Sequence, residues 1–192
     1  MEPLKGLTIV VFDDNPEEAQ KGIQAIEEAK KRYRGISCWN LTTTLYTDLS
    51  NIQTFFGEEI VPDHLAPFFY NLSPIADDNS VQDIDGRKLP NKFGIITDLM
   101  MPLYNEERLQ DSTLEPWGLF AAIAAMKRGI PVVVCSDLPG HGEGQYGSWF
   151  LRLFRALKIP LIPGKDWNKA VEQLIKEAHR LYGFQVDRIA GI

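Results

Sequence analysis

Apolar residues recur along the chain in short runs, separated by segments in which they follow helical spacing. Five apolar runs rich in β-branched residues are expected to be strands, at 7–12, 36–46, 93–97, 131–135 and 159–162. Helices are expected at 16–34, 48–56, 119–127, 148–157 and 166–182. Parallel strands need crossover connections, so this alternation predicts a doubly wound α/β fold with helices on both faces of a five-stranded parallel sheet.

The strands and helices are expected to form a single domain over residues 1–183, because the chain shows no internal repeat and no second domain. Two polar stretches, at about 57–92 and 103–115, are expected to be insertions. Residues 184–192 are expected to be a tail.

The first and last helices carry the clearest local signals. Asn15 is expected to cap the first helix, and Pro16 suits its first position. Charged residues four apart are expected to form ion pairs: Glu27 with Lys31 and Glu28 with Arg32. The last helix is expected to face the core with Ala170, Leu174, Ala178 and Leu181.

Composition narrows the class of protein. Of 192 residues, 44% are hydrophobic and 24% charged, as in globular proteins, and the net charge is −6. An acidic chain is a poor electrostatic match for nucleic acid or an anionic membrane. No apolar run approaches the ~20 residues that span a bilayer, and the start lacks a signal peptide, so a cytoplasmic location is expected. Cys38 and Cys135 are expected to be buried thiols.

Polar side chains follow four of the predicted strands. Asp13 and Asp14 follow the first, Asp98 the third, Ser136 the fourth and Lys165 the fifth. Ligands of open α/β sheets bind at the carboxyl ends of the strands, so these side chains are candidates for one site. Crowded carboxylates need a cation, and their oxygens suit Mg²⁺. A metal, a hydroxyl and an ammonium around one carboxylate suit transfer of a phosphoryl group to it.

In this order, the motifs resemble the receiver domain of two-component response regulators. The resemblance rests on four segments: VVFDD at 10–14, TDLMMP at 97–102, PVVVCS at 131–136 and GK at 164–165. It covers most of the chain apart from the two insertions and the tail. It implies a flavodoxin-like fold with strand order 2-1-3-4-5.

The resemblance also implies a role for each matching residue. Asp98 would be the phosphoacceptor, Ser136 would hydrogen-bond the phosphoryl group and Lys165 would pair with it. The ligands of Mg²⁺ would be Asp13, Asp14, Asp98 and the backbone carbonyl of Met100.

A protein of this kind takes part in a phosphorelay. The donor would be a histidine kinase or phosphotransfer protein, and the phosphoprotein would relay the signal by contact with a downstream protein. Asp98 would catalyse its own phosphorylation, so the protein would not be a turnover enzyme.

Three residues depart from the receiver pattern. Asp137 stands where receivers have a small residue, Asp166 where they have proline, and Ile162 where they often have an aromatic residue. These departures leave open a second interpretation, a receiver-like binding module that is not phosphorylated. A third interpretation is that the polar residues at strand ends only form turns.

A phosphatase of the haloacid-dehalogenase type is a further alternative. Asp13 would then be the nucleophile, with Ser136 and Lys165 in support. That family has Asp-x-Asp after its first strand, whereas Asn15 stands at the third position here. It also gives no role to Asp98.

Overall fold

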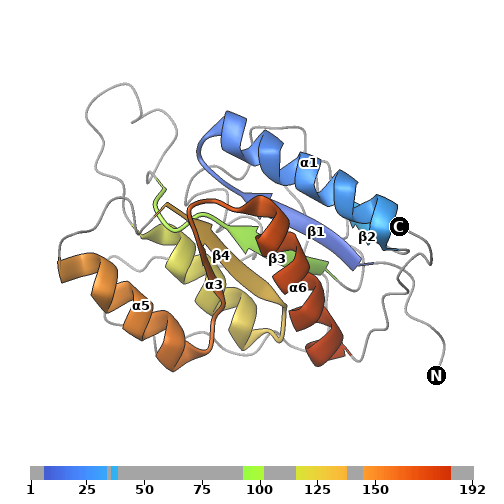
Figure 1. The fold of residues 1–192 in the computed structure, drawn as a ribbon. Helices are drawn as coiled ribbons and strands as arrows, with labels where there is room; N and C mark the ends of the chain where they lie inside the picture. The colour runs from blue at the N-terminus through green and yellow to red at the C-terminus, as the bar shows by residue number, and fades with distance from the viewer. Residues whose placement is uncertain (1–6, 34–35, 39–92, 102–115, 138–144, 183–192) are drawn as a thin grey trace, which may run out of the picture.

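The computed structural model describes residues 7–33, 36–38, 93–101, 116–137 and 145–182 (Figure 1). The strands are β1 (Leu7–Phe12), β2 (Ile36–Cys38), β3 (Phe93–Thr97), β4 (Val132–Ser136) and β5 (Leu161–Pro163). The helices are α1 (Pro16–Arg32), α3 (Trp117–Lys127), α5 (Gln145–Leu157) and α6 (Trp167–Tyr182). The predicted α/β class with a parallel sheet is confirmed.

Several expectations lie outside the described residues. They are the helix at 48–56, the insertions at 57–92 and 103–115, and the tail at 184–192.

The strands pair in parallel in the order β2-β1-β3-β4-β5. Phe12 of β1 is level with Thr97 of β3, and Thr97 is level with Val134 of β4. The residues that follow Phe12 and Thr97 therefore leave the sheet side by side, at the carboxyl ends of neighbouring strands.

Two apolar layers cover the sheet. On one face, α1 and α6 lie side by side and share an apolar cluster with Leu7 and Ile9 of β1 (Figure 1). On the other face, residues of α3 and α5 share a second cluster with Val10 and Phe12. Successive side chains of a strand point to opposite faces, so a run of apolar residues fills both layers. The thiol of Cys135 is buried, as predicted.

The start of α1 follows the prediction, but its ion pairs do not. The side chain of Asn15 accepts a hydrogen bond from the Glu17 N–H at 3.0 Å and caps the helix. The predicted pairing of Glu27 with Lys31 and of Glu28 with Arg32 is wrong. The pairs join residues three apart, Lys30 with Glu27 and Lys31 with Glu28, and Arg32 reaches Glu172 of α6 at 2.7 Å. Arg32 pairs with Glu172 rather than with Glu28 because α6 packs against α1 and brings Glu172 within its reach.

The prediction for α6 holds at three positions and fails at one. Ala170, Leu174 and Ala178 are buried, whereas Leu181 is 41% exposed. Tyr182, four residues after Ala178, packs against the core instead, because residues four apart share a helix face.

Two helices begin earlier than expected, and β5 is displaced. α3 begins at Trp117 rather than at 119, α5 begins at Gln145 rather than at 148, and β5 spans Leu161–Pro163 rather than 159–162. No helix in the described part of the chain combines the length and apolar character needed to cross a bilayer.

Candidate functional site

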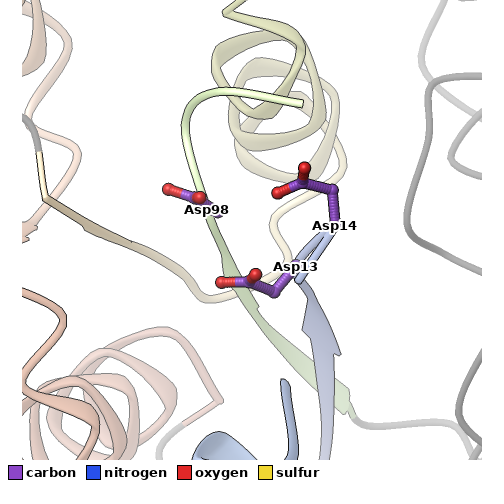
Figure 2. Close-up of side chains that lie close together, drawn as sticks. All are labelled: Asp13, Asp14 and Asp98. Atoms are coloured by element: carbon purple, nitrogen blue, oxygen red, sulfur yellow. The ribbon is translucent and has the colours of Figure 1, made fainter. Parts of the chain in front are cut away.

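Three carboxylates gather where β1 and β3 end. Asp13 and Asp14 follow β1 and Asp98 follows β3, with the three side chains on the same side of the two strand ends (Figure 2). One carboxylate oxygen of each lies within 4.8 Å of the others, and all three residues are buried. The strand register accounts for this meeting, because Phe12 and Thr97 are paired neighbours.

Backbone N–H groups hold one oxygen of Asp13 and one of Asp98. Oδ1 of Asp13 accepts from the Asn15 N–H at 2.9 Å, and Oδ1 of Asp98 accepts from the Leu99 N–H at 2.6 Å. The Asp98 N–H donates to the Phe12 carbonyl at 2.7 Å, which extends the β1–β3 ladder by one bond. The local backbone thus fixes both carboxyl groups.

Lys165 bridges the other oxygens of these two residues. Its Nζ lies 2.9 Å from Oδ2 of Asp13 and 2.9 Å from Oδ2 of Asp98. The lysine side chain is only 11% exposed. Charges so shielded from water interact strongly, so this ammonium is the main protein counter-charge of the cluster.

Ser136, at the end of β4, completes the surroundings of Asp98. Its side chain is buried and lies close enough to the Asp98 carboxyl for hydrogen bonding to lower the pKa of that group. The Gly164 N–H donates to the Ser136 carbonyl at 3.0 Å, which ties the end of β5 to the end of β4. The structure therefore brings together five of the six predicted site residues: Asp13, Asp14, Asp98, Ser136 and Lys165.

Met100, the sixth predicted residue, is partly buried against the core layer that contains α3. Its carbonyl as a metal ligand stays a prediction.

Burial and like charge set the electrostatics of the cluster. Burial, and next the charge of Asp98, raise the pKa of Asp13 to about 7. Burial also raises the pKa of Asp98, against the opposing effects of Lys165 and Ser136. Burial alone would lower the pKa of Lys165, but the two carboxylates outweigh it and the net shift is upward. The cluster holds three carboxyl groups and one ammonium, so Lys165 cannot neutralise all of them when they are ionised. The remaining negative charge favours the binding of a further cation.

The donor set fits a hard divalent cation. Carboxylate oxygens are the ligands that Mg²⁺ and Ca²⁺ prefer, whereas softer metals select sulfur or imidazole. Within the described ranges, this is the one group of three or more acidic, histidine or cysteine residues spaced to hold a metal. The structure thus provides a buried acidic cluster able to bind a metal ion.

Gly118 is a site residue that the sequence analysis missed. Its N–H donates to the Leu99 carbonyl at 3.0 Å, and a Cβ at this position would lie 1.6 Å from the Asp98 carbonyl oxygen. The Thr97 hydroxyl donates to the same oxygen at 2.8 Å. Only glycine lets α3 approach the Asp98 peptide this closely. The one signal in the sequence that could have identified Gly118 is its position at the start of an alanine-rich helix, because glycine is less favourable in a helix than alanine.

The three departures from the receiver pattern occupy different surroundings. Asp137 is exposed, and Ile162 packs on the α1–α6 face. Asp166 accepts a hydrogen bond from the Lys169 N–H at 3.1 Å and so caps α6. The described backbone contains no cis peptide bond, at Lys165–Asp166 or elsewhere.

Comparison with protein-family models, curated proteins and solved structures finds no match for this chain.

Proposed function

We propose that this protein is a receiver-like signalling domain of flavodoxin-like fold that accepts a phosphoryl group on Asp98 with Mg²⁺ bound beside it. One observation carries the proposal. The Asp98 carboxylate lies among two further carboxylates, the Lys165 ammonium and the Ser136 hydroxyl, where neighbouring parallel strands end. A nucleophilic carboxylate, a cation site and two groups that bind phosphoryl oxygens are what this transfer needs.

The reaction is a displacement at phosphorus. An oxygen of the Asp98 carboxylate forms a bond to the phosphorus of a phosphohistidine on the donor protein, while the P–N bond breaks. The electron pair of that bond stays on the imidazole nitrogen, which takes a proton from solvent. The product is an acyl phosphate on Asp98, and no oxidant or reductant is required.

The chain's own residues stabilise the charge of the transferred group. The Lys165 ammonium pairs with Asp98 and would pair with an oxygen of the phosphoryl group bound there. The Ser136 hydroxyl, which lies beside the Asp98 carboxyl, would donate a hydrogen bond to another phosphoryl oxygen. Fixed donors aimed at developing charge are worth most in a site shielded from water.

Asp13 and Asp14 would hold the metal together with Asp98 and the Met100 carbonyl. Bound Mg²⁺ supplies positive charge that keeps these carboxyl groups ionised and screens the incoming phosphoryl group. That ionisation matters because burial raises the pKa of Asp98, and a protonated carboxyl is a poor nucleophile.

The proposal includes a setting for the reaction. The phosphoryl donor would be a histidine kinase or phosphotransfer protein of a cytoplasmic two-component system. Contact with a downstream protein would carry the signal onward, and the domain would catalyse its own phosphorylation rather than turn over a substrate.

A specific observation favours a second candidate, a receiver-like binding module that is not phosphorylated. Lys165 already pairs with both Asp13 and Asp98, so part of the carboxylate charge is neutralised without a bound metal ion, and the ammonium has partners without a phosphoryl group. The phosphatase alternative loses support, because the Asn15 side chain caps α1 rather than facing the acids.

Incubation with acetyl phosphate and Mg²⁺, followed by intact-protein mass spectrometry, tests the proposal. Wild-type protein and Asp166→Asn, which changes an acid outside the cluster, are expected to gain one phosphoryl group, and Asp98→Asn none. Equal masses for wild type and Asp98→Asn would favour the binding module. Repeated turnover of a simple phosphate ester would instead favour the phosphatase.

A further inference from the structure

The backbone that presents Lys165 is in an unfavourable conformation. Gly164 and Lys165 follow each other with φ of 70° and 45°, in the left-handed region that residues other than glycine rarely adopt. Asp166 comes next, so no proline ring restricts this turn. Such a conformation persists only where surrounding contacts hold it.

Trp167 provides those contacts. Its backbone N–H donates to the Lys165 carbonyl at 3.0 Å. Its side chain is buried, and the indole N–H donates to Oε2 of Glu18, in the first turn of α1, at 3.0 Å. The ring lies against Gly22 of α1, where a Cβ would stand 3.0 Å from Cε3 of the indole. The Trp167 side chain therefore packs against α1 at Glu18 and Gly22, where the glycine leaves room for the indole ring.

The same helix begins directly after the acids. Asn15 caps α1 and its N–H is bonded to Asp13, so the start of α1 is fixed relative to the carboxylates. Through Trp167, α1 also fixes the turn that carries Lys165. One rigid helix thus sets the separation between the acids and the ammonium that bridges them.

We propose that the Glu18–Trp167 pair is a positioning device, which holds the Lys165 ammonium between Asp13 and Asp98. The consequence for phosphoryl binding rests on the proposed function, whereas the placement of Lys165 does not. Neither Glu18 nor Trp167 touches the reacting atoms, and both act through Lys165.

The chain offers two matched controls. Arg32 and Glu172 join α1 to α6 at 2.7 Å, remote from the turn that carries Lys165, so Glu172→Ala removes a link between the same helices without touching Trp167. Glu18 also pairs with Lys21, which is 60% exposed, so Lys21→Ala removes that ion pair and leaves the bond to Trp167. Glu18→Gln keeps an oxygen that accepts from the indole.

The first test measures the placement of Lys165 directly. Reductive methylation of lysines is followed over time by peptide mass spectrometry, with Lys30 as an internal standard. In Glu18→Ala and Trp167→Phe, Lys165 is expected to react about three to ten times faster than in wild type, as loss of one partly buried hydrogen bond allows. Glu172→Ala, Lys21→Ala and Glu18→Gln are expected to match wild type. Wild-type rates in both disrupted variants, or equal acceleration in Glu172→Ala, would overturn the inference.

The second test connects placement to function. Beryllofluoride, a mimic of the phosphoryl group, is titrated at saturating Mg²⁺, and Mg²⁺ is titrated separately. Glu18→Ala is expected to weaken beryllofluoride binding about three- to tenfold without weakening Mg²⁺ binding. Lys165 is expected to contact the phosphoryl group and not the metal, and its displacement leaves the charge of Asp13 and Asp98 less neutralised. Parallel losses of both affinities would contradict the inference. A wild-type protein that binds no beryllofluoride would remove the proposed function, while the methylation rates would still decide the positioning role.

Discussion

The acidic side of the site and its cationic side are built in different ways. Asp13 and Asp98 follow neighbouring, paired strands, and N–H groups one or two residues away hold their carboxylates. Lys165 instead extends from a left-handed turn that is held by Trp167. Trp167 is in turn held by Glu18 of α1, which lies 149 positions earlier in the sequence. The acids are placed by strand pairing and by N–H groups close to them in sequence, and the lysine is placed by packing between two helices. Substitutions should therefore affect the two sides separately.

The largest combined effect on stability and Mg²⁺ binding is expected from Gly118→Ala. A Cβ would stand 1.6 Å from the Asp98 carbonyl oxygen, so α3 or the Asp98 peptide must move. We expect a loss of about 3 kcal/mol in the free energy of unfolding, measured in urea, together with loss of Mg²⁺ binding.

Gly94→Ala is the matched control for this substitution. Its Cβ would meet the flexible side chain of Leu174 at 3.1 Å rather than backbone. It should lower stability less and keep Mg²⁺ affinity. Equal Mg²⁺ affinity in the two variants would show that α3 does not position Asp98.

Lys165→Met removes the shared counter-charge while keeping a side chain of similar length. It leaves two buried carboxylates facing each other, so we expect a loss of about 3 kcal/mol at neutral pH in the absence of divalent cations. Added Mg²⁺ should restore part of this loss. Urea unfolding with and without Mg²⁺ checks the prediction, and an unchanged stability would mean that the acids do not depend on Lys165.

Stability should fall as the pH rises from about 4 to about 7 when divalent cations are absent. The pKa of Asp13 is about 7 in the folded protein and 3.8 as its ordinary value, so between these values the native state binds more protons than the unfolded state. The free energy of unfolding then decreases with pH, by on the order of 2 kcal/mol. Asp13→Asn should flatten this slope. A stability that rises with pH in wild type would contradict the electrostatics of the cluster.

The smallest effect is expected from Glu172→Ala. The ion pair with Arg32 is partly exposed, so its loss should lower the free energy of unfolding by about 0.5 kcal/mol or less. Thermal unfolding of the two proteins measures this difference. Mg²⁺ affinity should not change. A measurable change in affinity would mean that the packing of α1 on α6 as a whole, and not one contact, controls the site.

The same contrast explains how much of the molecule the sequence predicted. Asp13, Asp14 and Asp98 were predictable because each follows an apolar run, and the carboxyl ends of parallel strands share one edge. Lys165 was predicted to belong to the site, but the left-handed turn from which its side chain extends was not predicted. Glu18 was not predicted to take part in the site, because its contact with Trp167 joins two packed helices and leaves no periodic signal.

Two further features escaped prediction for physical reasons. Gly118 stands beyond the stretch at 103–115, so no local pattern connects it with Asp98. The choice of Glu172 over Glu28 as the partner of Arg32 depends on where α6 packs. Local spacing identifies the residues that can pair, and tertiary structure selects among them.

Titration of Mg²⁺ into ¹⁵N-labelled protein, followed by NMR, tests the central claim most directly. We predict saturable shifts of backbone signals at residues 12–15 and 97–100, with one binding curve that is lost in Asp14→Asn and Asp98→Asn. Shifts that are absent, that scatter over the surface or that persist in both variants would contradict a shared cation site at the ends of β1 and β3.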